Sequence, residues 1–172
     1  MTEDFLSDGA ISLHKEHLLE LRRLYSVYKK SYEGLENYSI AQISRLHIPR
    51  AEKIKIQRLK GDIMAHELYF SSFGNRYTDS RAVRHSYGSI PSFYYRVKRD
   101  AMGRGAGFLF VFAKDGEVWH SFSCEPHEAF ESGAPILAID LFEHAYFTDY
   151  GFSREEYIDM ALSYLDLSKC DG

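Results

Sequence analysis

The sequence predicts an α+β protein, in which an N-terminal antiparallel helical hairpin precedes a small three-stranded antiparallel sheet with flanking helices. Apolar residues recur at steps of three and four through most of the first 75 residues, which is the period of an amphipathic helix. Two aromatic and β-branched runs, Phe108–Phe112 and Val118–Ser123, flank the pair Asp115-Gly116, a pattern typical of a β-hairpin. A third apolar run, Pro135–Ile139, supplies the remaining strand.

The helical hairpin is predicted from two apolar stripes and from the residues at their ends. Ser7 and Asp8 are typical of the start of a helix, and Gly34 is typical of its end. Pro49 is expected in the first turn of the second helix, which ends at Gly74. The first stripe consists of Ile11, His14, Leu18, Leu21, Tyr25, Tyr28 and Tyr32. The second stripe consists of Ile56, Leu59, Ile63, His66, Phe70 and Phe73.

Further helices are expected on both sides of the predicted strands. Residues 78–102 predict one or two helices, with a break near Gly88–Pro91. The segment Ser153–Glu156 fits a capping box, in which the first and last side chains each bond the other's backbone, and it opens a final helix. We therefore expect two domains, a helical hairpin over residues 1–75 and an α/β domain over residues 76–172.

Composition and charge argue against several classes of protein. The formal net charge of −4 does not suit a general nucleic-acid binder. No run approaches the roughly 18 apolar residues of a membrane span. The polar start, MTEDFLSDGA, has neither the apolar region of a signal peptide nor an Arg-rich transit segment. Because Cys124 and Cys170 form no CxxC pair, we expect a reduced, intracellular chain, cytoplasmic or mitochondrial.

Four residues have the side chains and the positions of a metal site. His14 and His66 each stand on an apolar stripe where Leu or Ile would normally pack, so both imidazoles point into one hairpin. Asp140 follows an apolar strand and precedes His144 by four residues, so a carboxylate and an imidazole can converge there. Taken singly, each has an ordinary explanation, as a hydrogen-bonded core histidine or a helix cap. Together they form a mixed nitrogen and oxygen set, which suits iron or manganese better than a soft metal.

The segment Ala134–Tyr150, which contains Asp-Leu-Phe-Glu-His-Ala-Tyr, closely resembles the C-terminal signature of the iron/manganese superoxide dismutases. Arg154 and the pair Tyr157-Ile158 extend the resemblance along the last helix. Weaker resemblances to the same family occur at Leu6–His14, Ala65–His66, Tyr87–Phe93 and Gly105–Phe110.

The resemblance implies a superoxide dismutase, which converts superoxide to dioxygen and hydrogen peroxide. One iron or manganese ion per chain would be held by His14, His66, Asp140 and His144, with solvent as a fifth ligand. Glu143 would reach across the interface of a homodimer to His144 of the partner subunit, where its carboxylate fixes the orientation of that ligand. Arg154 matches an arginine of the family motif and is expected to guide the anionic substrate.

The chain departs from the family pattern near the predicted metal. With His14 as a ligand, Leu18 and Arg22 take the places of the His and Tyr that line the family's substrate entrance. Phe147 replaces the tyrosine that reaches across the dimer to that His. Leu18 and Phe147 are therefore expected to meet at the dimer interface as an apolar pair, because a polar partner left alone there would be costly.

The residues expected to act on substrate or on metal-bound solvent differ as well. No glutamine stands where the family hydrogen-bonds that solvent; Asp62 occupies one of the two candidate positions, and His127 lies near the other. The candidate catalytic residues are Arg22, Asp62, His127 and Arg154. Three tryptophans of the family's metal pocket are replaced by Phe108, Phe110 and Phe142.

Three alternatives stay open. His17 could replace His14 as the first ligand, which would put Tyr25 at the position of the family's active-site tyrosine; His14 is preferred because it lies on the buried stripe. The chain could be a non-catalytic scaffold subunit of the same fold, such as a mitochondrial ribosomal protein, and only then would nucleic acid be an expected partner. A ferritin-like di-iron protein needs two Glu-x-x-His motifs on helices, whereas Glu117–His120 lies on a predicted strand.

Overall fold

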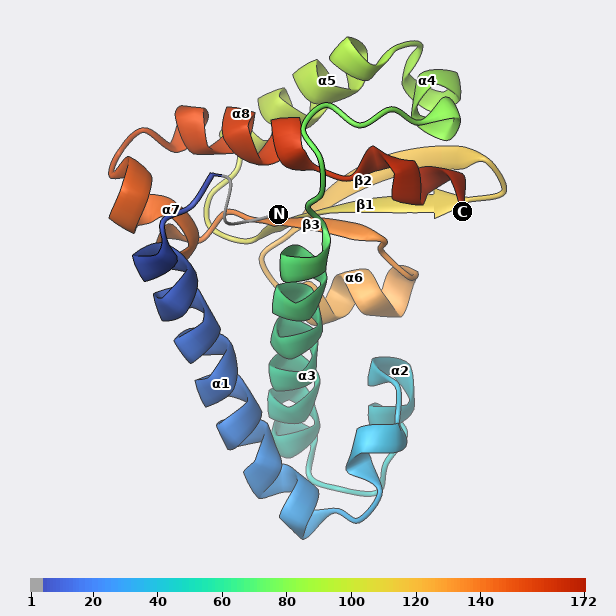
Figure 1. Cartoon of the computed structure of the whole chain (residues 1–172). Helices are drawn as coiled ribbons and strands as arrows, with labels where there is room; N and C mark the ends of the chain where they lie inside the picture. Colours follow the sequence, from blue (N-terminus) through green and yellow to red (C-terminus); the bar gives the residue numbers. More distant parts are fainter. Residues whose placement is uncertain (1–4) are drawn as a thin grey trace.

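The computed structural model describes residues 5–172 and has the α+β architecture that the sequence predicts (Figure 1). Residues 1–4, part of the polar start considered for a targeting segment, lie outside the described part. Two long helices form an N-terminal hairpin, and the rest of the chain builds a three-stranded antiparallel sheet with shorter helices around it. Within residues 5–172, no helix combines the length and the apolar character that crossing a membrane requires.

The hairpin is built from the two predicted stripes, which face each other. Its elements are α1 (Asp8–Ser31), η2 (Leu35–Asn37), α2 (Ile40–Ile43) and α3 (Arg50–Ser71). Oγ of Ser7 accepts a hydrogen bond from the Ala10 N–H at 3.2 Å and so caps α1, as predicted. Pro49 is the N-cap of α3 rather than a residue of its first turn. The buried core between these helices consists of Leu18, Leu21, Tyr25, Leu35, Ile43, Ile56 and Ile63.

The sheet has the strand order β2-β1-β3, with antiparallel neighbours throughout. Its strands are β1 (Phe108–Lys114), β2 (Glu117–Ser123) and β3 (Leu137–Asp140). Asp115 and Gly116 have φ angles of 53° and 81°, the left-handed pair that a two-residue hairpin turn needs. The predicted hairpin is thereby confirmed. Because β3 ends at Asp140, which pairs with Phe108 of the central strand, a carboxylate lies at the end of a fully buried strand.

Shorter helices surround the sheet. They are α4 (Arg81–Tyr87), α5 (Ile90–Met102), α6 (Pro126–Ser132), α7 (Glu143–Tyr150), α8 (Arg154–Tyr164) and η3 (Leu167–Asp171). The predicted break between α4 and α5 lies at Gly88, whose φ is 82°. The predicted capping box at the start of α8 is wrong, because Ser153 has φ −81° and ψ 53° instead of the extended backbone of an N-cap. Its side chain makes no capping bond, and its N–H donates to the Tyr150 carbonyl at 2.8 Å.

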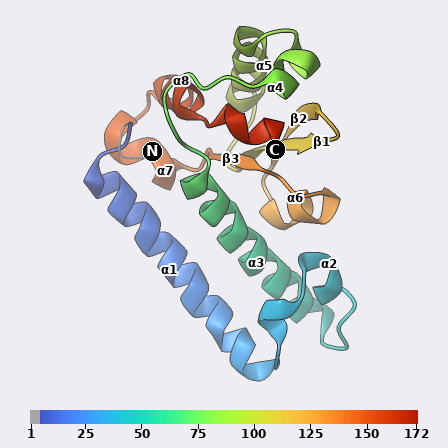
Figure 2. The same cartoon turned by 45° about the vertical axis from the view of Figure 1, so that its right-hand side comes forward.

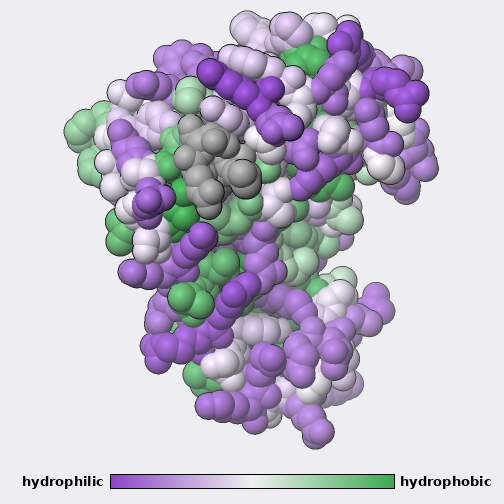
Figure 3. Space-filling view, in the orientation of Figure 1, coloured by the Kyte–Doolittle hydropathy of each residue, from purple (hydrophilic) through white to green (hydrophobic). Residues whose placement is uncertain are grey.

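Helices α4, α5 and α8 lie on one side of the sheet, and α3 and α6 lie on the other (Figures 1 and 2). Helix α7 lies beside the N-terminal end of α1, which also packs against α3. The face shown in Figure 3 is mostly hydrophilic, with small hydrophobic areas, one of them over the middle of α1. This packing brings four segments to the same part of the molecule. They are the start of α1, the second half of α3, the end of β3 and the start of α7.

Candidate metal centre

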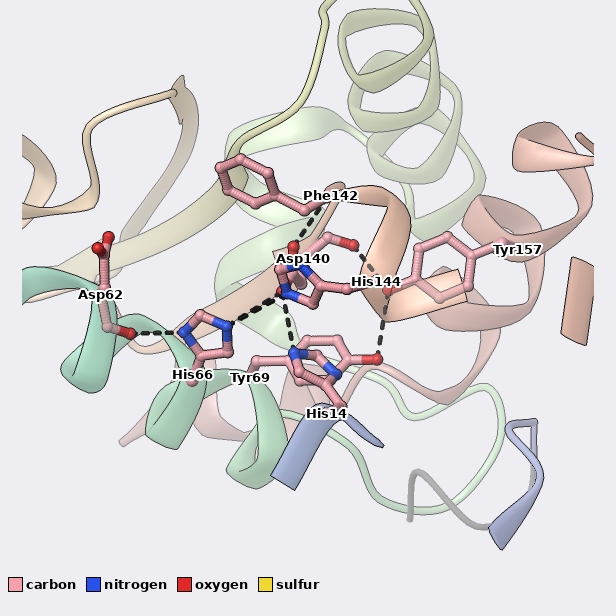
Figure 4. A network of polar contacts seen from close by, with 8 residues as sticks. All are labelled: His14, Asp62, His66, Tyr69, Asp140, Phe142, His144 and Tyr157. Atoms are coloured by element: carbon pink, nitrogen blue, oxygen red, sulfur yellow. Dashed lines mark hydrogen bonds and ion pairs between the residues drawn. The ribbon is translucent and has the colours of Figure 1, made fainter. Parts of the chain in front are cut away.

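Four side chains converge where the hairpin meets the sheet (Figure 4). They are His14 of α1, His66 of α3, Asp140 at the end of β3 and His144 of α7. One ligand-type atom of each lies within 4.8 Å of the others, and we refer to these residues as the four-residue cluster. His14 and Asp140 are fully buried and His66 is 2% exposed, whereas the side chain of His144 is 34% exposed. The cluster is therefore closed except at His144.

Local sequence explains how each side chain reaches the cluster. His14 and His66 lie on the buried stripes of their helices, so packing of α1 against α3 turns both rings inward. Asp140 is the last residue of β3, and Phe142 is the N-cap of α7. His144 therefore falls in the first turn of α7, directly after the strand that carries the carboxylate.

The distances within the cluster suit ligands that share one ion. Oδ2 of Asp140 lies 3.0 Å from Nε2 of His14 and 3.1 Å from Nε2 of His144. Nε2 of His66 lies 3.6 Å from that oxygen and 3.4 Å from Nε2 of His144. Around an ion about 2.1 Å from each ligand atom, neighbouring ligand atoms lie roughly 3.0–3.6 Å apart. A single metal ion therefore fits among these side chains.

Hydrogen bonding fixes the tautomer of His66. Its Nδ1 lies 2.6 Å from the backbone carbonyl oxygen of Asp62, which can only accept, so Nδ1 is the donor. Burial lowers the pKa of His66 to about 4, so the ring is neutral at neutral pH and its Nε2 carries no hydrogen. The lone pair of Nε2 therefore points into the cluster, as a metal ligand requires.

Asp140 is also held by groups outside the cluster. Its Oδ1 accepts a hydrogen bond from the Phe142 N–H at 2.9 Å, which leaves Oδ2 to face the imidazoles. Its backbone carbonyl accepts a bond from the Tyr157 hydroxyl at 2.7 Å. Burial alone would raise the pKa of Asp140, but the hydrogen bonds from His14 and His144 outweigh it and hold that pKa well below its usual range. The carboxylate is therefore charged.

Aromatic rings enclose the cluster where the family's tryptophans are absent. The ring of Phe108 meets His66 edge-on at 5.2 Å between centroids, and Phe142 stacks on His144 at 5.6 Å. Phe110 stacks on Phe108 at 5.7 Å and so backs this wall. Phenylalanine has no polar hydrogen, so these three rings give the cluster apolar surroundings but cannot donate a hydrogen bond to a metal ligand.

His17 lies beside the cluster but outside it. Its ring centroid is 4.6 Å from that of His144 and 5.1 Å from that of His66, and its side chain is exposed. Partial burial lowers the pKa of His17, and the neighbouring His144 lowers it further. Of the two histidines considered for the first ligand, the structure thus brings His14 into the four-residue cluster and leaves His17 at its outer edge.

Arg22 and Arg154 have partners away from the cluster. A guanidinium nitrogen of Arg22 lies 2.8 Å from Oε1 of Glu67, and both side chains are about half exposed. Arg154 donates to the carbonyl oxygens of Arg104 and Gly105 at 2.7 and 2.8 Å. Its guanidinium therefore holds the glycine-containing loop before β1, and a catalytic role for either arginine stays a prediction.

Asp62 and His127 lie near His66 but outside the four-residue cluster: Asp62 is one turn before His66 on α3, and His127 packs against Gly61 of the same helix. Asp62 reaches the cluster through its backbone carbonyl alone, and Figure 4 shows its carboxylate directed away from the four residues. Burial, together with the smaller effect of the neighbouring Glu125, raises the pKa of Asp62 to about 6. His127 packs its backbone against Gly61, where an added Cβ would lie 2.5 Å from the Cα of His127. Neither side chain is within the four-residue cluster.

Residues expected at a dimer interface differ in their exposure. Glu143 is exposed at the start of α7 and forms no hydrogen bond or ion pair within residues 5–172. Phe147 is 48% exposed and meets Phe152 edge-on. The predicted apolar pair is wrong for Leu18, which is 7% exposed and packs inside the hairpin. The rotation of α1 about its axis turns the side chain of Leu18 into the hairpin core. His17, one residue earlier, is exposed instead.

Sequence reasoning noted Tyr157 only as part of the family signature, and it missed Tyr69 and the contact between these two residues. Both are fully buried, and the Tyr157 hydroxyl donates to that of Tyr69 at 3.2 Å or to the Asp140 carbonyl at 2.7 Å. The ring of Tyr69 lies 4.8 Å from that of His14. The available signal was position: Tyr69 follows His66 by three residues, on the same face of α3.

Comparison with known proteins agrees with this geometry. Residues 76–171 match the family described as iron/manganese superoxide dismutases, C-terminal domain. An iron superoxide dismutase of Cupriavidus metallidurans is 24% identical over 159 residues, which cover 82% of this chain and 81% of the relative. A manganese/iron enzyme of Rickettsia prowazekii is 30% identical over 91 residues, 48% of this chain and 41% of the relative. A manganese enzyme of Haloarcula marismortui is 27% identical over 89 residues, 51% and 44% of the two chains. The chain belongs to the iron/manganese superoxide dismutase family.

Proposed function

We propose that this chain is a superoxide dismutase that holds one iron or manganese ion with the four-residue cluster. The observation that carries the proposal is the arrangement around one buried carboxylate oxygen. Oδ2 of Asp140 faces the Nε2 atoms of His14, His66 and His144 within 3.0–3.6 Å. Oxygen and imidazole ligands suit iron and manganese, and both metals appear in the names of the relatives.

The chemistry that such an ion supplies when bound is one-electron exchange between two oxidation states. Two superoxide anions and two protons give one dioxygen and one hydrogen peroxide, so atoms and electrons balance within the substrate itself. The residues of the chain must hold the ion, admit a small anion and exclude bulk water.

Each residue of the site has a part in that task. Asp140 supplies the negative charge, and Phe142 and Tyr157 keep its two ends in place. The Asp62 carbonyl fixes the orientation of His66 and strengthens its Nε2 as a ligand. Three neutral imidazoles and one carboxylate leave a divalent or trivalent ion with net positive charge, which attracts an anionic substrate.

The open side of the cluster also fits a homodimer. His144 is the only member with substantial exposure, and the exposed Glu143 precedes it on α7 without an ion-pair partner within residues 5–172. A two-fold axis at this surface would let each Glu143 bond His144 of the partner subunit, which gives two equal charge-assisted contacts. The dimer would then cover the part of the site that the single chain leaves exposed.

A scaffold role leaves these polar groups unexplained. Burying a carboxylate and three imidazoles costs more free energy than burying apolar side chains of similar size, even when they are hydrogen-bonded to one another. The ferritin-like alternative is excluded by the placement of Glu117–His120 on strand β2.

The experiment that tests the proposal measures bound metal and superoxide removal in the purified chain after reconstitution with iron or with manganese. His14→Ala should abolish metal retention and activity together, whereas His17→Ala should keep the metal. Wild-type protein without bound metal, or with a stoichiometric zinc ion and no dismutase activity, would refute the proposal. Metal loss in His17→Ala with retention in His14→Ala would move the first ligand to His17.

A further inference from the structure

A cavity of about 290 Å³ lies between α5 and α8, on the face of the sheet away from α3 (Figures 1 and 2). Its volume is at the lower end of the roughly 300–1,000 Å³ of small-ligand sites, so it suits a single ring better than a larger molecule. The connection between α3 and α4 adds one wall to the two helices. The lining residues are Tyr77, Tyr94, Tyr95, Lys98, Asp159 and Leu162, together with Ser163.

Two of the three tyrosines stand at the open side of the cavity, where Tyr77 is 64% exposed and Tyr95 is 68% exposed. Tyr77 has φ 57°, a left-handed conformation that a bulky residue rarely adopts. Its N–H donates to the Ser163 carbonyl of α8 at 2.6 Å, and the Arg76 guanidinium lies over its ring at 4.9 Å. Backbone strain held in this way is found most often at functional sites.

The third tyrosine, Tyr94, has a buried hydroxyl with no hydrogen-bond partner within residues 5–172. Buried polar groups without partners are rare in native structures, because such a group has lost its bonds to water and gained none. The ring of Tyr94 packs against Phe93, with 5.8 Å between centroids. A phenol hydroxyl can donate and accept, so a ligand that brings one polar atom to Tyr94 would satisfy it.

The charged groups of the cavity satisfy each other. Nζ of Lys98 lies 2.7 Å from Oδ1 of Asp159 and 2.8 Å from Oε1 of the neighbouring Glu155. Neither Lys98 nor Asp159 therefore needs an ion as a partner. The aromatic rings and Leu162 make the rest of the lining mostly apolar, which favours an uncharged ligand.

We propose that this cavity binds a small, uncharged aromatic compound whose ring packs against the tyrosines and whose polar atom bonds the Tyr94 hydroxyl. The class of ligand is a single-ring phenol. p-Cresol is the probe, and toluene is its match without a hydroxyl. The inference does not rest on the proposed function, because none of the lining residues belongs to the four-residue cluster.

The test measures the dissociation constants of p-cresol and toluene by ligand-observed NMR titration of the full-length chain. Wild type should bind p-cresol about fivefold more tightly than toluene, which is the effect of one ordinary hydrogen bond. Tyr94→Phe keeps the ring but removes the hydroxyl, so it should weaken p-cresol about fivefold and leave toluene within about twofold. Tyr95→Ala removes an aromatic wall and should weaken both compounds about threefold. Tyr38→Phe, at a half-buried tyrosine of the hairpin, is the matched control and should change neither.

The thermal melting midpoint of each variant without ligand shows whether the variant is folded. Tyr94→Phe should keep or raise the midpoint, because it removes a buried group that has no partner. A clearly lowered midpoint would mean that this hydroxyl bonds the chain itself, which would overturn the inference. Absence of p-cresol binding at millimolar concentration, or equal affinity of wild type for p-cresol and toluene, would overturn it as well. Because the titration needs neither metal nor superoxide, its failure is distinct from failure of the proposed function.

Discussion

Nε2 of His66 faces Oδ2 of Asp140 across 3.6 Å, and neither atom carries a hydrogen. The hydrogen of His66 is on Nδ1, where the Asp62 carbonyl accepts it. Two electron-rich atoms held this close in a buried site would be stabilised by a cation that binds both. Metal binding at this site should therefore depend strongly on the charge of the Asp140 carboxylate.

Replacing Asp140 with Asn should remove most of the bound metal. The amide keeps the size of the side chain but loses its charge, and loss of a ligand should exceed the roughly 10–100-fold effect on affinity of losing a group that orients one. Elemental analysis should give one iron or manganese per wild-type chain and less than about a tenth of that in Asp140→Asn. Asp159→Asn, at an exposed carboxylate paired with Lys98, is the control and should keep its metal. Full metal content in Asp140→Asn would contradict the assignment.

Replacing Glu143 with Ala should weaken dimerisation and metal retention together. The proposed contact to His144 of the partner subunit is both part of the interface and a support for a ligand. Sedimentation at micromolar concentration, combined with metal analysis, measures both effects. Glu155→Ala, which removes an exposed partner of Lys98, should change neither. A wild-type monomer with metal and activity intact would show that the chain does not use this interface.

Replacing Tyr157 with Phe should destabilise the fold by about 1–3 kcal/mol, because the buried Asp140 carbonyl then loses its donor and the buried Tyr69 hydroxyl loses its hydrogen-bond partner. Urea denaturation of the metal-free chains measures this difference without the contribution of metal binding. Tyr95→Phe, at a side chain that is 68% exposed, should change the free energy of unfolding by less than about 0.5 kcal/mol. Equal stability of Tyr157→Phe and wild type would mean that this hydroxyl does not support Asp140.

Two glycine substitutions in helices should have opposite effects. Alanine in a helix interior normally stabilises by about 0.5–1 kcal/mol relative to glycine. At Gly61 of α3, however, a Cβ would lie 2.5 Å from the backbone of His127 and force α6 away, so Gly61→Ala should lower the melting midpoint. At Gly9 of α1, a Cβ would meet its nearest neighbour, Oγ of Ser7, at 3.7 Å, so Gly9→Ala should keep or raise it. A stabilised Gly61→Ala would refute close packing of α3 on α6.

Asp171 should contribute a pH-dependent part of the stability. Its carboxylate accepts hydrogen bonds from the backbone N–H groups of Ala82 and Arg81 and from the Ser80 hydroxyl, at the start of α4. The bond from the Ala82 N–H is the main cause that lowers the pKa of Asp171 in the folded chain. The stabilisation is therefore complete above the unfolded pKa of about 4 and is lost as the pH falls through the lower, folded pKa.

Urea denaturation of wild type and Asp171→Asn at several pH values checks this. The difference in the free energy of unfolding should be constant between about pH 5 and pH 7 and should shrink below about pH 4. A difference that persists unchanged at pH 2 would show that the charge of Asp171 is not what caps α4.

Local patterns were sufficient for the architecture and for the types of residue in the site. The period of the two apolar stripes predicted α1 and α3, and the pair Asp115-Gly116 predicted the turn between β1 and β2. His14 and His66 stood out because a polar side chain on an apolar stripe has to find a partner. The short helix α6 and the backbone of Ser153 escaped sequence reasoning, because a few residues carry too weak a signal against tertiary contacts.

The sequence by itself determined the fold class, the family and the four side chains that are candidates for the metal. Only the tertiary structure decided which side chains lie next to them. One residue along α1 is about 100° of rotation, and that step turns Leu18 into the hairpin core and leaves His17 against His144. The long side chains of Arg22 and Arg154 bond Glu67 and the carbonyls of Arg104 and Gly105. These partners come from segments that are distant in the sequence. A long, flexible side chain can bond any suitable group nearby, so its partner is known only once the packing of those segments is known.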